Sequence, residues 1–338
     1  MATELKSIDL FAGIGGIRLG FEQAFGDQIS TAFVCEWDKY AQMTYKANFN
    51  DDFEIAGDIL SVDEKTIPHF DICLAGFPCQ AFSIAGIGGY GRNGFNDDFK
   101  GLNRGNLFLE VVRICEYHKP KVIFCENVKG LVTHDKGNTF RVIREAFKSI
   151  GYQVFWKVLN SKDFGLAQNR ERIYIVAFRD DLNIGEFVFP DGTFEDVCIR
   201  DILEDAPIAA KYYISDTYLA FMQAHKARHA SKGHGFGYEI RSLDGIAGTI
   251  VCGGMGRERN LIIDHRPHDM TPQTRIKGAI NKEDIRKLTP RECARLQGFP
   301  DTYQLTLSDT RLYKQLGNSV AVNVIQAIAE RIKEALTK

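Results

Sequence analysis

A cysteine at position 79 stands just where a buried strand should end. The apolar run Ile72–Ala75 is typical of such a strand, and Gly76-Phe77-Pro78 leads from it into Cys79. In open α/β sheets, ligands bind beyond the carboxyl ends of the strands, so a thiol here lies where chemistry takes place. Proline restricts the backbone before the thiol, and the glycine-rich stretch 85–91 after it suits a loop that closes over a ligand. The alternative is a turn that carries a buried cysteine.

A carboxylate follows a second apolar strand pattern. Residues 121–125 predict a buried strand, and Glu126 comes directly after it. Since both strands are expected in the centre of one sheet, Glu126 should face the same edge as Cys79. The polar segment Gln168-Asn169-Arg170-Glu171-Arg172 stands at the entry to a further strand.

A glycine turn follows the first predicted strand, residues 7–11. The sequence Ala12-Gly13-Ile14-Gly15-Gly16 turns the chain into a helix that runs to Gly26, a suitable C-cap. The pattern suggests a dinucleotide-binding turn, but Arg18 stands where the third glycine of GxGxxG belongs. The turn can still bring its backbone close to a nucleoside, with or without a pyrophosphate.

The second strand, residues 31–35, ends in Glu36-Trp37-Asp38. An acidic residue at this position suits the hydroxyls of a ribose, and Trp37 could stack on a purine. Packing in the core is the alternative role for Trp37. A helix is expected over residues 39–48, then a short third strand before Gly57.

In the second half of the chain, the regular pattern of strands and helices is interrupted by a long irregular stretch and then returns. Residues 152–159 and 172–178 predict two strands, and no helical pattern separates them, so they should pair antiparallel. Residues 190–285 are irregular and rich in glycine and histidine. A capping box with proline at the first helical position begins a helix at 289–292. The last helix presents one apolar face, which should dock on the first domain: Val322, Ile325, Ile328 and Ile332.

Composition describes an ordinary globular protein. The 338 residues, 44% hydrophobic and 25% charged, suggest about two domains with a sizeable core. We expect an intracellular protein, because no stretch approaches a membrane span and the first residues lack the form of a signal peptide. The eight cysteines include no CxxC pair and no Cys/His cluster, which favours reduced thiols over disulfides or a metal site.

Positive charge is concentrated in one part of the chain. Residues 225–300 contain 14 Lys and Arg against 8 Asp and Glu, a net charge of +6, which leaves −8 for the remainder of a chain with net charge −2. A basic segment on an acidic body is typical of a protein that binds phosphate with one part. A chance excess on a solvated face is the alternative.

Taken in order, these segments resemble the DNA (cytosine-5) methyltransferases of the compact bacterial restriction–modification type. The similarity covers nearly the whole chain apart from about residues 185–285, and it depends on the order and spacing of several short segments. The matching segments are residues 9–16, 36–38, 57–59, 76–80, 126–128, 168–172, 286–300 and 315–320.

The resemblance implies an α/β fold with two domains. The larger, discontinuous domain would comprise residues 1–190 and 300–338, with a Rossmann-like sheet, helices on both of its faces and a site for S-adenosylmethionine. Residues 191–285 would form a smaller, irregular and mostly β target-recognition domain, joined by a hinge at 286–299. A cleft between the domains would hold double-stranded DNA, in agreement with the charge distribution.

The resemblance also implies a mechanism. Cys79 would add to C6 of a cytosine flipped out of the duplex, which makes C5 nucleophilic. Glu126 would donate a proton or a strong hydrogen bond to N3, for which it needs a pKa raised by burial. Arg172, with Arg170 beside it, would contact O2 and orient the carboxylate. S-adenosylhomocysteine and 5-methylcytosine would be the products.

Two further sets of residues are carried over from the family pattern. The predicted cofactor-binding residues are Phe11, Gly13, Ile14, Gly15, Glu36, Trp37, Asp58, Ile59, Pro78, Leu107, Asn318, Ser319 and Val320. Core packing is the alternative for Phe11, Ile59, Leu107 and Val320. The predicted DNA-binding residues are Gln80, Ser83, Thr249, Arg257 and Arg259, of which the two arginines could read guanine or bind phosphate. No metal is expected. The loop 85–104 is longer than in the smallest relatives, so the residue that fills the space of the flipped base stays open.

Three other functions are alternatives to the methylation of cytosine in DNA. The same chemistry on tRNA is the nearest alternative, although that branch usually has Pro-Pro-Cys where this chain has Phe77-Pro78-Cys79. A NAD-dependent oxidoreductase is disfavoured by the interrupted glycine motif, and a non-catalytic DNA-binding relative by the presence of Cys79, Glu126 and Arg172. We expect a monomer in the bacterial cytosol, associated with the nucleoid through DNA. The resemblance allows for a cognate restriction endonuclease, with which no stable complex is expected.

Overall fold

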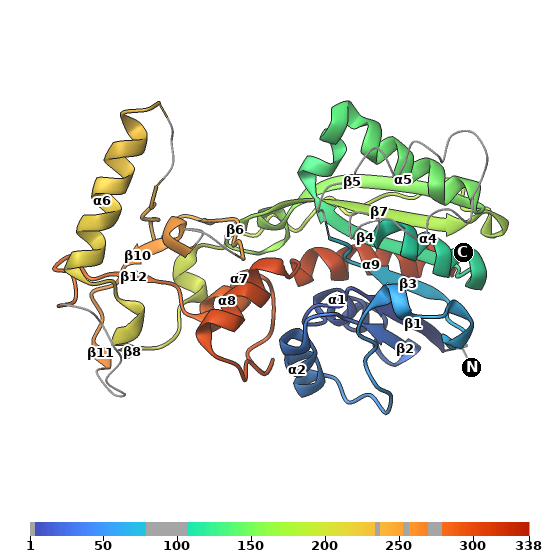
Figure 1. Cartoon of the computed structure of the whole chain (residues 1–338), viewed down its shortest axis with the longest axis horizontal. Helices are drawn as coiled ribbons and strands as arrows, with labels where there is room; N and C mark the ends of the chain where they lie inside the picture. The colour runs from blue at the N-terminus through green and yellow to red at the C-terminus, as the bar shows by residue number, and fades with distance from the viewer. Residues whose placement is uncertain (1–3, 79–106, 234–236, 253–256, 270–278, 338) are drawn as a thin grey trace. The chain divides into compact units, whose positions relative to one another are not determined.

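The computed structural model describes residues 4–78, 107–233, 237–252, 257–269 and 279–337. Contacts between residues divide the chain into two units, whose elements are labelled in Figure 1. The first unit comprises residues 1–160, 171–192 and 324–338, and the second comprises 161–170 and 193–323. Residues 300–323 thus group by contacts with the second unit, whereas the sequence assigned them to the larger domain. The expected boundaries of the functional domains stay a prediction.

A six-stranded sheet in the order β2-β1-β3-β4-β7-β5 forms the centre of the first unit. Its strands are β1 (Leu5–Leu10), β2 (Ile29–Cys35), β3 (Ile72–Ala75), β4 (Val122–Val128), β5 (Tyr152–Asn160) and β7 (Glu171–Arg179). The first four strands are parallel, and β7 runs antiparallel to both β4 and β5. The expected antiparallel pair is therefore confirmed.

The prediction of a short strand before Gly57 is wrong. Only Ala56 pairs there, in a single bridge with Cys35. The chain turns immediately afterwards, because the Asp58 carboxylate accepts a hydrogen bond of 3.1 Å from Leu60 N and so caps a short 3-10 helix, Ile59–Ser61. Local capping at this point ends the extended conformation before a strand can grow.

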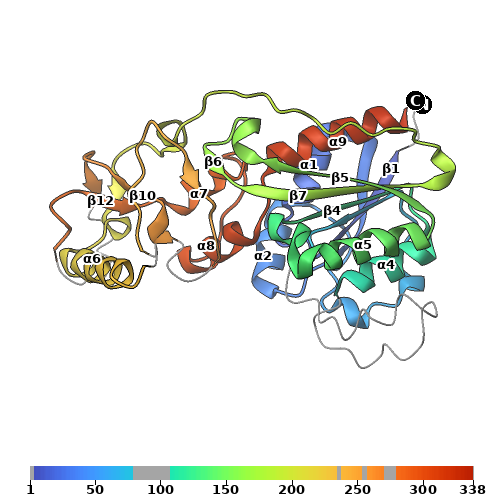
Figure 2. The ribbon, with the colours of Figure 1, turned by 90° about the horizontal axis from the view of Figure 1, so that it is seen from above.

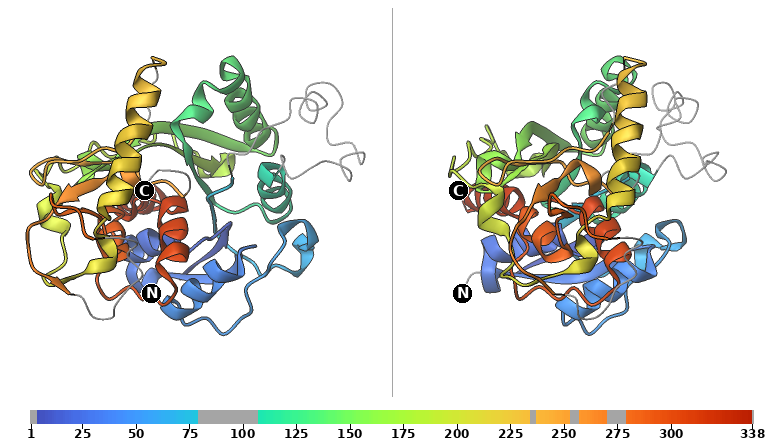
Figure 3. Two further views of the ribbon diagram at one scale, coloured as in Figure 1. Left: turned by 60° about the vertical axis from the view of Figure 1, so that its left-hand side comes forward. Right: turned by 90° about the vertical axis from the view of Figure 1, so that its left-hand side faces the viewer.

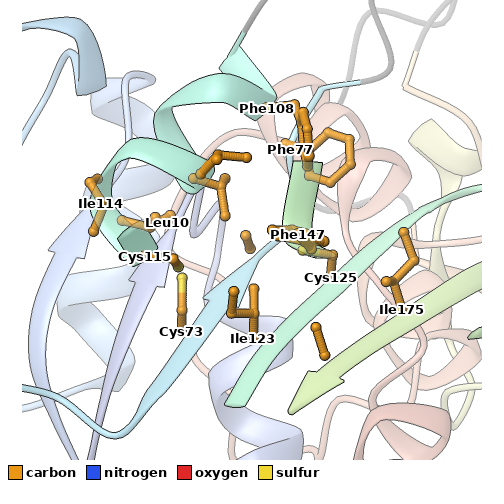
Figure 4. Packing of buried hydrophobic residues seen from close by; sticks show 14 of the residues in the cluster. Leu10, Cys73, Phe77, Phe108, Ile114, Cys115, Ile123, Cys125, Phe147 and Ile175 are labelled. Atoms are coloured by element: carbon orange, nitrogen blue, oxygen red, sulfur yellow. The ribbon is translucent and has the colours of Figure 1, made fainter. Parts of the chain in front are cut away.

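Helices cover both faces of the sheet. They are α1 (Gly16–Phe25), α2 (Lys39–Asn48), α4 (Leu107–His118), α5 (Asn138–Ser149) and α9 (Val322–Leu336). Figure 2 shows α1 and α9 on one side of the sheet and α4 and α5 on the other. Successive strand residues point to opposite faces, so every second residue of each central strand enters the core beneath α4 and α5. Figure 4 shows this core, with Leu10, Cys73, Ile123 and Ile175 supplied by the strands.

Close packing holds α1 and α9 on the opposite face. The rings of Phe21 and Phe124 meet edge to face with their centroids 5.1 Å apart. A Cβ atom on Gly20 would lie 2.6 Å from Cβ of Ile325, so only glycine allows α1 to approach α9 this closely. Ile328 and Ile332 of α9 are also fully buried. The apolar face predicted for the last helix therefore packs on the first unit as expected.

Among the described residues of the second unit, the main elements are short strands and three α-helices. The strands are β6 (Gln168–Asn169), β8 (Ile208–Ala209), β9 (Ala247–Gly248), β10 (Leu261–Ile263), β11 (His268–Asp269) and β12 (Ile285–Lys287), and they pair two by two. The helices are α6 (Asp216–Ala230), α7 (Pro290–Leu296) and α8 (Asp309–Asn318). Helix α6, seen well in Figure 3, was not expected from the sequence. It buries only Leu219 and Met222, so it carries too narrow an apolar stripe to reveal a helix.

A buried ionic network anchors the start of α7. The Thr289 hydroxyl and the Glu292 side chain form the predicted capping box. The Glu292 carboxylate also accepts hydrogen bonds of 2.7 and 2.8 Å from Arg286, whose third nitrogen donates to Asp264 at 2.7 Å. Arg286 is fully buried, so its two carboxylate partners are needed to compensate the loss of water. The segment expected to be a hinge is thus firmly held within the second unit.

Candidate active site and cofactor-binding turn

The ends of β3 and β4 lie side by side, as the sequence predicted. The two strands are parallel neighbours, with Ala75 in register with Cys125. Beyond them, the buried Asn127 side chain donates a hydrogen bond of 2.9 Å to the Phe77 carbonyl. This bond ties the chain that leads into Cys79 to the residue after Glu126. Cys79 itself lies outside the described residues, and so do Gln80 and Ser83.

An ion pair joins the ends of β4 and β7. Glu126 is opposite Tyr174 and Val128 is opposite Arg172, so the Glu126 and Arg172 side chains emerge on the same face as diagonal neighbours. Arg172 Nε lies 3.2 Å from Glu126 Oε1, and the two side chains are only 13% and 11% exposed. A guanidinium in this position can orient the carboxylate and balance its charge.

Arg170 makes different contacts from Arg172 and binds backbone carbonyls of the second unit. Its guanidinium is buried and donates hydrogen bonds to the carbonyls of Ile250 at 3.0 Å, Gly317 at 3.4 Å and Ser319. These are contacts with the backbone of two separate segments. The contact of Arg170 with the base, which the sequence suggested, stays a prediction.

The glycine turn after β1 is tied to the end of β2 through Glu36. The Glu36 carboxylate accepts hydrogen bonds of 2.7 Å from Gly13 N and from Asp38 N. Gly13 and Gly15 have positive φ angles of 58° and 80°, which glycine adopts without strain. A Cβ atom on Gly15 would lie 2.2 Å from the Phe49 ring, whereas one on Gly13 would meet nothing within 4 Å. The turn is therefore tightly packed on one side and open at Gly13.

Arg18, which interrupts the glycine motif, contacts a residue that packs against the same turn, because its guanidinium lies 4.2 Å from the centroid of the Phe49 ring. Its guanidinium is buried and lies 2.6 Å from both Asp51 and Glu22. It also donates a 3.0 Å hydrogen bond to the Tyr45 hydroxyl. A third glycine would remove this anchor.

The other predicted cofactor residues of the first unit differ in exposure. Trp37 is 66% exposed, which disfavours the alternative of core packing. Ile14 and Ile59 are buried, and Phe11 and Leu107 are partly buried against the large core. Pro78 is exposed at the last described position before the gap. Asn318, Ser319 and Val320 belong to the second unit, where Asn318 ends α8 and the other two residues follow it directly.

A buried acid at the first strand was not singled out from the sequence. Asp9 is fully buried, and both of its carboxylate oxygens accept no hydrogen bond within the described part of the chain. Burial raises the pKa of the Asp9 carboxyl to about 8, although the positive charge of Arg18 acts to lower it. A single acidic residue within an apolar strand pattern was the signal that could have pointed to it.

Of the predicted DNA-binding residues of the second unit, Thr249 lies beside β6. The Thr249 hydroxyl donates a hydrogen bond of 2.7 Å to the Asn169 carbonyl, and Ile250 N donates one of 2.9 Å to the Gln168 side chain. Arg257 and Arg259 share a short 3-10 helix, Arg257–Arg259, in which Arg259 is exposed. No group of three or more acidic, histidine or cysteine side chains in the described part of the chain could hold a metal ion.

The sequence model of the family described as C-5 cytosine-specific DNA methylase matches residues 5–334. The chain belongs to this family. It is a DNA (cytosine-5) methyltransferase of the type II restriction–modification kind. The family assignment rules out the NAD-dependent oxidoreductase that the glycine turn had left as an alternative.

Relatives of this methyltransferase cover nearly its whole length. It is 52% identical to the type II methyltransferase M.HpaII of Haemophilus parainfluenzae over 333 residues, which cover 97% of this chain and 89% of that protein. It is 43% identical to M.NlaX of Neisseria lactamica over 332 residues, 98% of this chain and 97% of that protein.

Solved structures support the fold assignment. The Dnmt2 methyltransferase of S. pombe matches with a TM-score of 0.72 at 19% identity, covering 99% of this chain and 100% of that chain. The Rossmann-like sheet with helices on both faces is therefore confirmed. Among the helices in the described ranges, none combines the length and apolar character needed to cross a membrane.

Proposed function

We propose that this methyltransferase transfers a methyl group from S-adenosylmethionine to C5 of a flipped-out cytosine in double-stranded DNA, through a covalent bond between Cys79 and C6. The observation that carries the proposal is the Glu126–Arg172 ion pair beside the tethered chain that enters the Cys79 loop. This reaction needs a thiol, a carboxyl group and a guanidinium, which Cys79, Glu126 and Arg172 would supply.

The proposed steps follow from the chemistry of these side chains. The Cys79 thiolate forms a bond to C6, and the electron pair of the C5–C6 double bond moves toward C5 and the N3–C2–O2 system. Glu126, in its protonated form, would donate a proton to N3, while Arg172 orients the carboxyl group and binds O2. C5 would then take the methyl group of the bound donor as the carbon–sulfur bond of that donor breaks, and N3 would return its proton to Glu126. A water molecule would take the C5 proton. The electron pair then reforms the double bond and expels the Cys79 thiolate.

The glycine turn supports the proposal that the methyl donor binds in the first unit. S-adenosylmethionine, when bound, supplies an activated methyl group. Glu36 holds its carboxylate at the end of β2, where a ribose binds in related sheets, and Trp37 presents an exposed ring for an adenine. The space over Gly13 leaves room for a ligand to approach the backbone. Asp58, Ile59, Pro78 and Leu107, with Asn318–Val320, would complete the site.

We further propose that residues 191–285 read the DNA sequence. Thr249, Arg257 and Arg259 would contact DNA from this region, and Gln80 and Ser83 from the Cys79 loop. The protein would act as a monomer in the bacterial cytosol. A cognate endonuclease would cut the same sequence without binding the methyltransferase stably, which size-exclusion chromatography of the two proteins together would test.

Bisulfite sequencing of DNA from cells that express the chain tests the function directly. We expect cytosines within one short recurring sequence to resist conversion by bisulfite because they are methylated. In cells that express Cys79→Ser, these cytosines should be converted. That variant should still bind S-adenosylmethionine, because the thiol is needed for attack on C6 alone. Cys198→Ser is the control and should keep full activity. Methylation by Cys79→Ser at the parental rate would disprove the role of the thiol.

DNA with 5-fluorocytosine at the modified position tests the covalent step. Fluorine cannot leave C5 as a proton does, so the adduct should persist on a denaturing gel. Absence of an adduct with active enzyme and the correct site would exclude the covalent mechanism. Purified tRNA, offered in the same methylation assay, should remain unmodified.

A further inference from the structure

Two segments of the second unit that are proposed to bind different ligands touch each other through their backbones. The first follows β9 and contains Thr249, proposed to contact DNA. The second, Gly317–Val320, begins in the last turn of α8, and its residues Asn318–Val320 are proposed to contact the cofactor. A Cβ atom on Gly317 would lie 2.4 Å from Cys252 N and 2.5 Å from the carbonyl carbon of Val251. Only glycine allows so close an approach of two backbones.

A third segment, Gln168–Arg170, runs beside the first. Strand β6 pairs in parallel with β9, so that Gln168 is in register with Ala247. The Gln168 side chain accepts a hydrogen bond of 2.9 Å from Ile250 N, and the Asn169 carbonyl accepts one of 2.7 Å from the Thr249 hydroxyl. The position of Thr249 is therefore set by this segment.

Arg170 joins all three segments. One guanidinium nitrogen donates to the Ile250 carbonyl at 3.0 Å, and a second donates to the carbonyls of Gly317, at 3.4 Å, and Ser319. Gly317 lies in the last turn of α8, where carbonyl groups carry the partial negative charge of the helix dipole. The buried cation thus lies at a favourable place, and it forms one bridge between the proposed DNA and cofactor segments.

Two glutamines extend the bridge into the end of α7. The Gln168 side-chain nitrogen donates to the Leu296 carbonyl at 2.8 Å and to the Gln297 side chain at 3.2 Å. Gln297 in turn donates to the Leu316 carbonyl of α8 at 2.8 Å. Gln168 and Gln297 are fully buried, so their hydrogen bonds cannot be replaced by water without disturbing the packing.

We propose that Arg170 is a positioning residue that couples cofactor binding to DNA binding. This inference rests on the proposed function, since it takes the Thr249 segment to contact DNA and the Asn318–Val320 segment to contact S-adenosylmethionine. A ligand that fixes the carbonyls of one segment fixes the guanidinium, and the guanidinium fixes the carbonyls of the other. Each ligand then binds more tightly when the other is present, and by thermodynamic linkage the two factors are equal.

Arg170→Lys is the test variant. Lysine keeps the positive charge but lacks the planar fork that reaches three carbonyls. The dissociation constant of a duplex containing the methylated site is measured by fluorescence anisotropy with and without S-adenosylhomocysteine, which permits no turnover. The dissociation constant of S-adenosylhomocysteine is measured by calorimetry with and without the duplex. We expect both measurements to give a coupling factor of about 5 or more for the parent and close to 1 for the variant.

Arg291→Lys is the matched control. Arg291 also donates to two backbone carbonyls of the second unit, those of Pro300 at 3.3 Å and Tyr303 at 2.8 Å, but it contacts neither ligand segment. Arg291→Lys should lower the thermal stability of the protein about as much as Arg170→Lys does, and it should leave the coupling factor unchanged. The comparison separates coupling from a general structural role.

Gly317→Ala provides a second route to the same answer. The added methyl group pushes the Val251–Cys252 backbone away from Gly317 while Arg170 is kept. It should lower the coupling factor as well, and it decides the question if Arg170→Lys does not fold.

Two results would overturn the inference: no coupling in the parent, or parental coupling in Arg170→Lys. A loss of DNA affinity in that variant that is the same with and without S-adenosylhomocysteine is the second of these results, and it would mean that Arg170 supports DNA binding independently of the cofactor. A parent protein that binds neither ligand would instead overturn the proposed function.

Discussion

Arg172 Nε lies 3.2 Å from Glu126 Oε1, on neighbouring antiparallel strands. The pair is largely buried, so each charge depends on the other for compensation. Asn127, next to Glu126, holds the chain that leads to Cys79. The end of β4 therefore carries the candidate proton donor, Glu126. Through Asn127 it also positions the chain that leads to the candidate nucleophile, Cys79.

Glu126→Gln should abolish most of the methyl transfer. The amide keeps the shape of the side chain but cannot donate a carboxylic proton to N3, so we expect kcat to fall by about 10²–10⁴-fold. Affinities for DNA and S-adenosylmethionine should change little. Arg172→Lys should cause a smaller loss, because the charge remains near the carboxylate. Glu171→Gln is the control, since Glu171 forms an exposed ion pair with Lys129. A Glu126→Gln enzyme with parental kcat would exclude Glu126 as the proton donor.

Trp37→Ala and Glu36→Ala should each weaken S-adenosylmethionine binding. Stacking on the exposed indole and a hydrogen bond to the ribose are each worth about 1 kcal/mol or more, a change of about fivefold or more in the dissociation constant. Calorimetry with the purified variants measures it. Trp156→Ala, which changes the other tryptophan of the chain, should bind the cofactor as the parent does. Unchanged affinity in both variants would refute the assignment of the site to the glycine turn.

Asp9 should make the stability of the fold depend on pH. Burial raises its folded-state pKa to about 8, well above the value of about 3.9 in an unfolded chain. The folded state then binds one more proton than the unfolded state between about pH 4 and 8, so the free energy of unfolding falls as pH rises through this range.

Asp9→Asn should remove this contribution, which is at most about 1.4 kcal/mol per pH unit. Urea unfolding at pH 5, 6.5 and 8 measures it, and the variant should lose less stability than the parent between pH 5 and pH 8. Asp27→Asn, at an exposed position, is the control and should follow the parent. A parallel pH dependence in the parent and Asp9→Asn would show that Asp9 titrates normally.

Exchange of residues 190–285 should change the sequence that is methylated. If this region reads DNA, a chimera with the corresponding residues of a relative that has another target should methylate the target of that relative. Cofactor affinity should stay close to that of the parent, because the glycine turn is unchanged. Bisulfite sequencing identifies the site. An active chimera that still methylates the parental sequence would contradict the assignment.

Arg257→Ala and Arg259→Ala distinguish two roles for these arginines. Loss of a base-reading arginine should cost about 1–3 kcal/mol and relax one position of the site. Loss of a phosphate-binding arginine should weaken binding to all sequences alike and reduce its salt dependence. Anisotropy with a set of single-base site variants at several salt concentrations separates the two.

Much of the fold could be predicted from local patterns. Apolar runs marked the central strands, the glycine turn marked the start of α1, and the capping box at Thr289 marked the start of α7. These signals are local because capping, positive φ angles and the alternation of buried residues depend on near neighbours in the chain. Helix α6 was missed because it buries few apolar side chains, and the strand expected before Gly57 was ended by the cap at Asp58.

The sequence by itself determined the family, the order of the strands along the chain and the edge of the sheet at which Glu126 stands. Only the tertiary structure decided which side chains meet. The register of β4 against β7 brings Arg172 to Glu126, and a shift of one residue would turn that side chain to the opposite face. Likewise, the burial of Asp9 and the carbonyl contacts of Arg170 depend on segments far away in the sequence. A local pattern indicates the face on which a residue lies, but not its partner, because partners are set by packing between elements.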